Sequence, residues 1–189
     1  MTKGLFRSQG ALDGLCGPYA VVNAFTELHA AETYAQQAAL FKAACHAIAK
    51  KRWPGAVQAG TSFYDLKAMI AAAQKRAGAA VTADYPFENG VEPKRGAADY
   101  LAQLLELIPR AGKGCAILCV RRASDAWEDH WIVARRHGGR LQFIDSVDQR
   151  GGTITTRNPA SLRVGGVRKQ DRHWHLPARD QVVIFAVRG

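Results

Sequence analysis

Apolar residues recur every three or four positions along much of the first half of the chain, a spacing that is typical of amphipathic helices. We expect the first helix to begin near Cys16, because Pro18 fits the first turn of a helix, where no backbone N–H is required. The same pattern predicts three further helices, over about residues 33–51, 63–76 and 95–107.

Polar and turn-forming residues mark the ends of these helices. Thr61 or Ser62 can cap the third helix, and Gly78 is expected to close it. The Trp-Pro-Gly tripeptide at residues 53–55 is expected to end the second helix. Residues 84–93, which include two prolines and a glycine, are expected to form a loop.

After Pro109 the pattern changes to short apolar runs with β-branched residues, which are typical of buried strands. Such runs occupy residues 115–120, 130–135, 140–145 and 181–187. Residues 136–139 predict a hairpin between the second and third of these strands, and residues 146–179 are expected to hold loops and weaker strands. Helices followed by strands predict an α+β fold, with N-terminal helices packed on a C-terminal antiparallel sheet in one domain, residues 1–189.

The composition is that of an ordinary globular protein, with 48% hydrophobic and 22% charged residues among 189. The first residues lack the apolar stretch of a secretory signal, and no apolar run approaches the ~20 residues that cross a bilayer. Four cysteines are too few in a chain of this length to form a disulfide framework. We therefore expect a cytoplasmic protein with no membrane partner, while signal-independent export stays open.

The net charge of +10 is unevenly distributed along the chain. From Arg110 onward there are 15 Lys and Arg residues and 7 Asp and Glu residues, so most of the excess lies in the second half. This charge would suit an acidic protein partner or nucleic acid. The basic residues stand singly or in pairs without an interleaved aromatic motif, so a nucleic-acid partner is not expected.

The segment at residues 13–20, Asp-Gly-Leu-Cys-Gly-Pro-Tyr-Ala, places Cys16 at the start of the first predicted helix. The backbone amides and the dipole at a helix N-terminus favour the thiolate form of a cysteine. The N–H of Cys16 would point toward a developing oxyanion. Gly14 and Gly17 would leave room for a substrate backbone. The structural alternative is a buried cysteine beside a turn.

A histidine and an aspartate lie at opposite ends of the predicted hairpin. His130 opens one strand, and Asp145 closes the next. In an antiparallel pair the start of one strand lies beside the end of the other, so these side chains are expected to be neighbours. His130 would then take the proton of Cys16, while Asp145 would orient the imidazole and stabilise its charged form.

The pattern Gln…Cys-Gly-Pro-x-Ala-x-x-Asn-Ala, followed by His-Trp-Ile-Val…Phe-Ile-Asp, resembles the papain-like cysteine peptidases. It is most similar to their small bacterial branch, the bacteriocin-leader peptidase domains and their relatives. In that branch a Cys-Gly-Pro helix start precedes a His with three apolar residues after it, and an Asp follows one hairpin later. The resemblance covers about residues 7–31 and 115–146.

The resemblance implies that Cys16 is the nucleophile, His130 the base, Asp145 the orienting group and Gln9 the side-chain donor to the oxyanion. The glutamine of the family usually lies six residues before the cysteine, whereas Gln9 lies seven before Cys16. A loop with two glycines can absorb the extra residue. Ser8 or a backbone amide is the alternative donor.

The reaction implied by this resemblance is cleavage of a peptide or isopeptide bond through a thioester acyl-enzyme. Other papain-fold enzymes use the same groups for glutamine deamidation, transglutamination or acyl transfer, as in bacterial effectors, and the residues do not separate these reactions. A catalytically silent binding module is a further alternative, against which the complete Cys-His-Asp set argues.

No cofactor or metal is expected for this reaction. Cys115 and Cys119 could be combined with His173 and His175 into a zinc set. However, two residues four apart on one strand are about 13 Å apart, too far to share one metal ion.

The expected substrate is a protein or peptide, and the similar leader peptidases cleave after paired glycines. Trp131 would narrow the cleft beside His130, unless it lies in the core. Small residues near the scissile carbonyl would suit such a narrow cleft. The basic second half would favour an acidic substrate, for example a ubiquitin-like protein.

Overall fold

The computed structural model describes residues 6–7, 14–78, 81–109, 113–122, 129–146, 154–155, 162–164, 174–176 and 182–187. Within these residues the helices are α1 (Cys16–Glu27), α2 (Tyr34–Ala47), the 3-10 helix η1 (Lys50–Arg52), α3 (Trp53–Ala59), α4 (Phe63–Arg76) and α5 (Ala97–Leu107). No helix in these ranges is long and apolar enough to cross a membrane.

The described strands form one sheet with the order β1-β8-β2-β3-β4-β5, and β7 pairs with both β2 and β6. Their bounds are β1 (Val81–Asp84), β2 (Gly114–Arg122), β3 (Asp129–His137), β4 (Arg140–Ile144), β5 (Ile154–Thr155), β6 (Leu162–Val164), β7 (Trp174–Leu176) and β8 (Val182–Val187). The pairs along the main order are antiparallel, and β6 pairs with β7 in parallel. The expected α+β fold is confirmed, and β1 is a strand that the sequence pattern did not predict.

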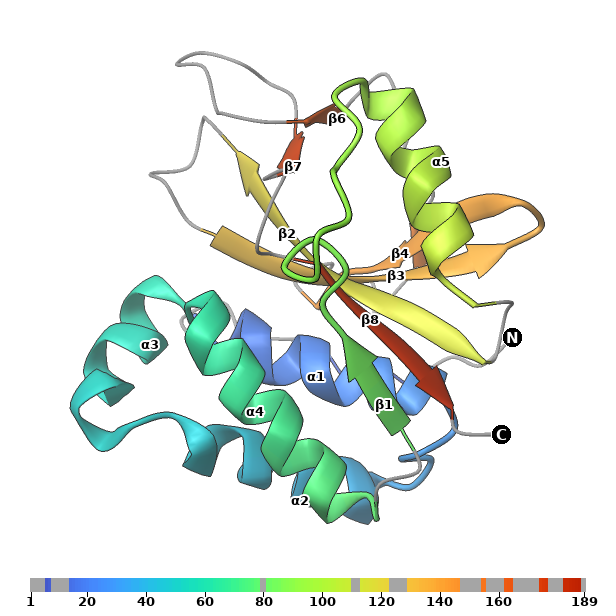
Figure 1. Cartoon of the computed structure of the whole chain (residues 1–189). Helices are drawn as coiled ribbons and strands as arrows, with labels where there is room; N and C mark the ends of the chain where they lie inside the picture. The colour runs from blue at the N-terminus through green and yellow to red at the C-terminus, as the bar shows by residue number, and fades with distance from the viewer. Residues whose placement is uncertain are drawn as a thin grey trace.

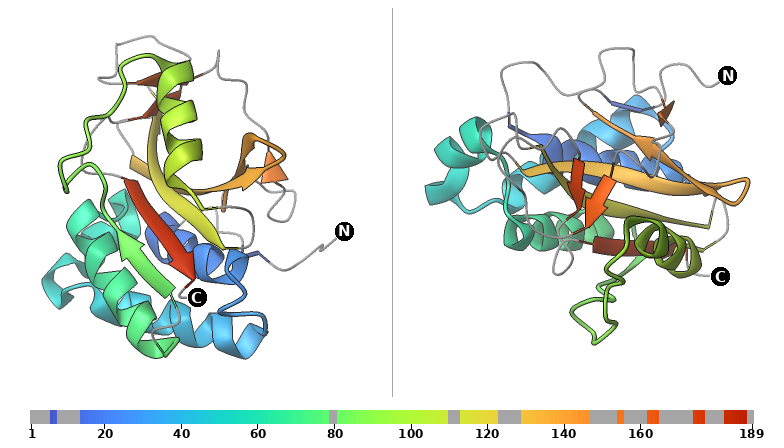
Figure 2. Two further views of the ribbon diagram at one scale, coloured as in Figure 1. Left: turned by 45° about the vertical axis from the view of Figure 1, so that its right-hand side comes forward. Right: turned by 90° about the horizontal axis from the view of Figure 1, so that it is seen from above.

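The sheet separates two hydrophobic cores (Figures 1 and 2). Helices α1 to α4 lie on one face, where alternate strand residues such as Cys119, Trp131 and Val133 face them. Helix α5 lies on the other face and packs against the intervening residues, which include Ile132 and Ala134. The two-residue alternation of a strand therefore explains the unbroken apolar runs at residues 115–120 of β2 and 131–134 of β3, since both faces of the sheet are covered there.

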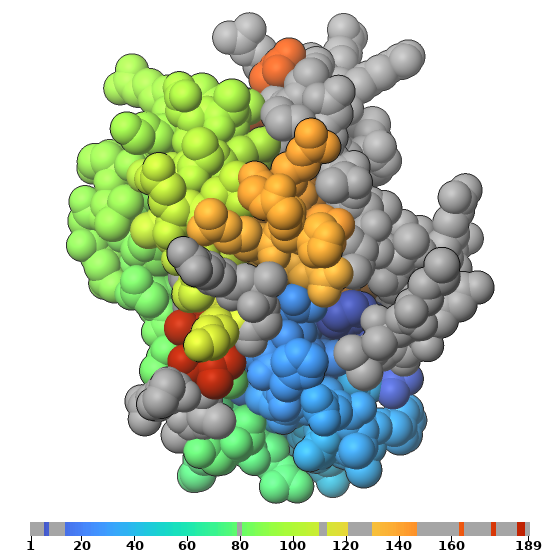
Figure 3. Space-filling view, turned by 90° about the vertical axis from the view of Figure 1, so that its right-hand side faces the viewer, coloured from blue at the N-terminus to red at the C-terminus, as the bar shows by residue number. Residues whose placement is uncertain are grey.

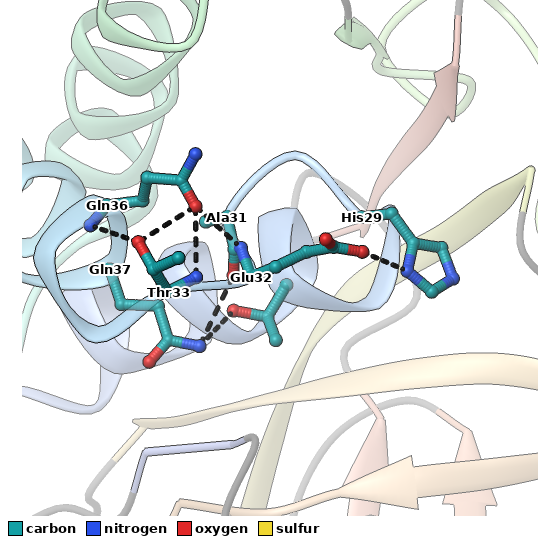
Figure 4. Close-up of polar contacts among 7 residues, drawn as sticks. His29, Ala31, Glu32, Thr33, Gln36 and Gln37 are labelled. Atoms are coloured by element: carbon teal, nitrogen blue, oxygen red, sulfur yellow. Dashed lines mark hydrogen bonds and ion pairs between the residues drawn. The ribbon is translucent and has the colours of Figure 1, made fainter.

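Side-chain hydrogen bonds fix the starts of two helices. At the start of α2, Thr33 accepts a hydrogen bond from the backbone N–H of Gln36, and Gln36 accepts one from that of Thr33 (Figure 4). Ser62 and Asp65 form the same reciprocal arrangement at the start of α4. Each arrangement satisfies two N–H groups that the helix itself leaves unpaired. The predicted cap at Ser62 and the predicted span of α4 are confirmed.

The Trp-Pro-Gly tripeptide begins a helix, so the prediction that it ends one is wrong. Helix α2 already ends at Ala47, and Trp53 opens α3 after the 3-10 turn of η1. The physical reason is that proline is unfavourable in the interior of a helix but suits its first turn, where Pro54 lies.

The predicted hairpin joins β3 to β4. Gly138 and Gly139 have φ angles of +52° and +76°, a left-handed conformation that is open to glycine with little strain. The register pairs Val133 with Ile144, so that the beginning of β3 lies beside the end of β4. The hairpin, drawn in orange, lies on the surface between α5 and the blue N-terminal helices (Figure 3).

Candidate active site

Cys16 is the first residue of α1 and is 3% exposed. Leu15 precedes it as the N-cap residue, and its aliphatic side chain cannot cap the helix by a hydrogen bond. Pro18 lies in the first turn, as predicted. The N-terminal end of the helix dipole is therefore directed at the Cys16 thiol rather than at a polar N-cap side chain.

The imidazole of His130 is hydrogen-bonded to both Cys16 and Asp145. Its Nε2 lies 2.7 Å from Oδ1 of Asp145, and a second side-chain hydrogen bond joins the ring to Cys16. The side chains of His130 and Asp145 are 17% and 8% exposed, which shields both from water. The structure thus brings three of the four predicted site residues together.

These contacts stabilise the charged form of His130. Burial of the imidazole lowers the pKa of His130, but the hydrogen bonds and charges of Asp145 and Cys16 raise it more strongly, from 6.5 to about 9. Both contacts therefore favour the imidazolium form of the ring at neutral pH. An imidazolium that is hydrogen-bonded to a cysteine sulfur is the partner that a nucleophilic thiolate requires.

The glycines on either side of Cys16 pack against the protein itself, so the prediction that they leave room for a substrate backbone is wrong. A Cβ atom added to Gly14 would lie 2.7 Å from the backbone N of Gly60. One added to Gly17 would collide with the side chain of Thr61 and lie 2.9 Å from Met69. Both glycines are needed because α1 begins in close contact with the segment between α3 and α4.

Trp131 lies in the core and does not narrow a cleft beside His130. It is 1% exposed, its Nε1 donates a hydrogen bond of 2.9 Å to the carbonyl oxygen of Thr61, and its ring stacks on Phe63. The alternative interpretation of this tryptophan, as a core aromatic, is confirmed.

The segment before Cys16 is anchored to α1 by Asn23. The Asn23 side chain accepts a hydrogen bond of 2.8 Å from the backbone N–H of Arg7 and donates one of 3.1 Å to its carbonyl oxygen. This pairing gives Asn23 a structural role. Gln9 and Ser8, the two candidate side-chain donors to the oxyanion, lie outside the described residues.

A buried ion pair joins the two elements that carry Cys16 and His130. Arg135 of β3 lies 2.9 Å from the carboxylate of Glu27 at the end of α1, and the two side chains are 22% and 7% exposed. The thiol of Cys115 lies nearby, and burial followed by the charge of Glu27 raises its pKa. These contacts hold the far end of α1 against the sheet.

The four cysteines are all buried as thiols. Cys115 and Cys119 share one face of β2, as the strand assignment predicted. Among the described residues, no three His, Cys, Asp or Glu side chains are grouped so that they could hold a metal ion. His175 lies in β7, and His173 is outside the described residues.

A polar pocket of about 470 Å³ lies beside the first turn of α1. It is lined by Lys51, Arg52, Gly55, Ala59, Gly60, Thr61 and Ser62. Gly60 and Thr61 are the same residues against which the glycines flanking Cys16 pack. The sequence analysis did not single out this pocket, although the three consecutive cations at residues 50–52 were a signal for it.

Comparisons of the chain with models of protein families, with curated proteins and with solved structures find no match. The arrangement of Cys16, His130 and Asp145, together with the sequence motifs around them, is therefore the basis on which a function can be proposed.

Proposed function

We propose that the chain is a papain-like cysteine hydrolase that cleaves peptide or isopeptide bonds. The observation that carries this proposal is the double hydrogen bond of His130, to Cys16 on one side and Asp145 on the other. A thiol at a helix start, a base within reach and a carboxylate that orients the base together provide a nucleophile of the cysteine-peptidase type.

In the proposed reaction the Cys16 thiolate attacks the substrate carbonyl carbon, and a C–S bond forms as the carbonyl oxygen becomes an oxyanion. The His130 imidazolium then gives its proton to the leaving amine, and the C–N bond breaks to leave a thioester. A water molecule then attacks the thioester carbonyl carbon, and His130 accepts a proton from this water. Release of a carboxylic acid restores the thiolate and imidazolium.

Asp145 is proposed to keep the imidazole oriented throughout, since its bond to Nε2 leaves the other ring nitrogen for the proton exchange with Cys16. The backbone N–H of Cys16, in the first turn of α1, is the proposed main-chain donor to the oxyanion. Gln9 is the proposed side-chain donor, by the family resemblance alone, with Ser8 or a backbone amide as the alternative.

The proposed substrate is a protein or peptide, and cytoplasmic location is kept as part of the proposal. Deamidation, transglutamination and acyl transfer pass through the same thioester and differ in the carbonyl accepted or the attacking nucleophile. A preference for small residues near the scissile bond follows only from the resemblance to leader peptidases, because neither glycine nor Trp131 forms a narrow cleft here.

Selective alkylation tests the nucleophile. Exposure alone would favour Cys45, which is 8% exposed, over Cys16 at 3%. If Cys16 is activated by His130, iodoacetamide at neutral pH should nevertheless label Cys16 first, as read by peptide mapping. His130→Ala should remove this preference. Faster labelling of Cys45 in the wild type would contradict the proposal.

Substitutions test the remaining roles with a substrate identified from a fluorogenic peptide panel. Cys16→Ala and His130→Ala should abolish turnover, and Asp145→Ala should retain more activity because it orients rather than transfers the proton. Loss of an oxyanion donor typically lowers kcat by about 100- to 1000-fold, the range expected for Gln9→Ala. Full activity in Gln9→Ala would assign the oxyanion contact to another group.

A further inference from the structure

The pocket beside α1, here called the basic pocket, carries an excess of positive charge. Lys51 and Arg52 both line it. Within the described part of the chain, Lys51 forms no ion pair, while Arg52 donates a hydrogen bond of 2.8 Å to Asp65. Two cations against one carboxylate leave the pocket with a net positive charge that an anionic ligand would neutralise.

Arg52 is held in place by Asp65, and part of its guanidinium stays free to bind a ligand. Asp65 accepts hydrogen bonds from the backbone N–H and the hydroxyl of Ser62 at 2.9 and 2.7 Å, in addition to the bond from Arg52. The Asp65 carboxylate is 8% exposed, so it is held in place inside the protein. The Arg52 side chain is 47% exposed and can be reached by a ligand from the solvent. A guanidinium has five N–H donors, so this bond to Asp65 still leaves donors that can reach a second carboxylate.

The basic pocket is adjacent to the proposed nucleophile. Gly60 and Thr61, in its wall, pack against Gly14 and Gly17, which lie two residues before and one residue after Cys16. An extended peptide advances about 3.3 Å per residue, so a substrate bound at Cys16 reaches this wall within a few residues. The pocket is therefore placed to bind a side chain close to the scissile bond.

We propose that the basic pocket is the subsite that binds an acidic side chain of the substrate, an Asp or Glu within about three residues of the scissile carbonyl. This inference depends on the proposed function, because it takes Cys16 as the group that attacks the substrate. It narrows the substrate class to peptides or proteins with an acidic residue beside the cleavage point.

The chain offers two informative variants and one matched control. Lys51→Glu reverses a charge in the pocket wall, and Lys50→Glu makes the same change at the neighbouring position, which does not line the pocket. Gly55→Leu instead places a bulky uncharged side chain at the pocket wall. An added Cβ at Gly55 meets no atom within 4 Å, so this change introduces no clash at that atom and should favour α3, because glycine is a poor helix former.

The experiment measures the rate at which peptidyl acyloxymethyl ketones label Cys16, by mass spectrometry of the intact protein. The probes end in Gly at the electrophile and carry Glu, Gln, Ala or Lys at one of the three preceding positions. At one position the wild type should react with the Glu probe at least about fivefold faster than with the Gln probe. Lys50→Glu should keep this ratio, whereas Lys51→Glu and Gly55→Leu should reduce it to about one.

Chloroacetamide, which has no side chain to recognise, separates the two proposals. Equal rates for Glu and Gln probes at all positions, with normal chloroacetamide labelling of Cys16, would overturn the acidic subsite and leave the proposed function standing. An equal decrease of the Glu-to-Gln rate ratio in Lys50→Glu and Lys51→Glu would also overturn the acidic subsite. The preference for Glu would then come from the positive charge of the whole protein and not from the pocket. Failure of chloroacetamide to label Cys16 would remove the proposed function and the subsite with it.

Discussion

At the scale of single residues, the two glycines beside Cys16 fit the small-residue pattern expected next to a nucleophile, but they contact the protein itself. Small residues next to a nucleophile suggest clearance for a substrate. Here the space beside Gly14 and Gly17 is filled by Gly60, Thr61 and Met69 of the same chain. A sequence pattern does not say which backbone approaches a glycine, so this role could be assigned only once the segment between α3 and α4 was placed.

The raised pKa of His130 gives a prediction at the same scale. An NMR titration of the imidazole should have its midpoint near pH 9 in the wild type, because Asp145 and Cys16 stabilise the imidazolium. Asp145→Asn and Cys16→Ala should each move the midpoint to lower pH. The first removes a charge that raises the pKa, and the second removes both a charge and a hydrogen bond. A midpoint near 6.5 in all three proteins would contradict the contacts of His130.

The same shift makes stability depend on pH with a definite sign. The folded-state pKa of His130 lies above the unfolded value, so protonated His130 stabilises the folded state fully below about pH 6.5. This contribution, on the order of 3 kcal/mol, is lost as the pH rises through about 9. Urea unfolding should show a decline over this window that is absent in His130→Gln. A parallel decline in both proteins would assign the dependence to other groups.

At the scale of elements, the features that depend on neighbouring residues, namely helix starts and the hairpin turn, could be predicted from the sequence. The start of α1 followed from Pro18, the start of α4 from Ser62, and the hairpin from its two glycines. Because antiparallel pairing then follows from the hairpin alone, the proximity of His130 and Asp145 was also predictable. The short strand β1 pairs with β8, which lies about 100 residues later in the chain. A pattern within residues 81–84 alone could not predict this pairing, because it depends on a distant segment.

The ion pair between α1 and β3 allows a test of how these elements are held together. Arg135→Met should lower the free energy of unfolding by about 3–5 kcal/mol, because it leaves the buried carboxylate of Glu27 without its cation. Replacing both partners, as Glu27→Leu with Arg135→Met, should recover much of this loss. Urea unfolding of the two single variants and the double variant measures the coupling.

A more exposed pair provides the matched control for this cycle. Lys67 and Glu88 form an ion pair in which both side chains are 32% exposed, and Lys67→Met should cost about 1 kcal/mol or less. If Arg135→Met lowers the free energy of unfolding no more than Lys67→Met does, the ion pair between Glu27 and Arg135 does not hold α1 on the sheet.

At the scale of the whole molecule, the net charge of +10 should accelerate encounters with acidic substrates. Exposed charges are screened over about 10 Å at 0.1 M salt, so the labelling of Cys16 by a Glu-containing probe should slow between about 20 and about 300 mM salt. The rate with uncharged chloroacetamide should stay constant and serves as the control. A salt-independent rate for the acidic probe would show that the overall charge does not steer binding.

The placement of the three proposed catalytic groups has a consequence for the protein during its synthesis. Cys16 leaves the ribosome early, while His130 and Asp145 follow only after all the described helices have been made. β2, which pairs with β3, is also paired with β8 near the end of the chain. Until those late strands have joined the sheet, Cys16 has no imidazolium beside it and is an ordinary thiol. A nascent chain would therefore carry a cysteine without its proposed base, and the proposed activity would require that the late strands have joined the sheet.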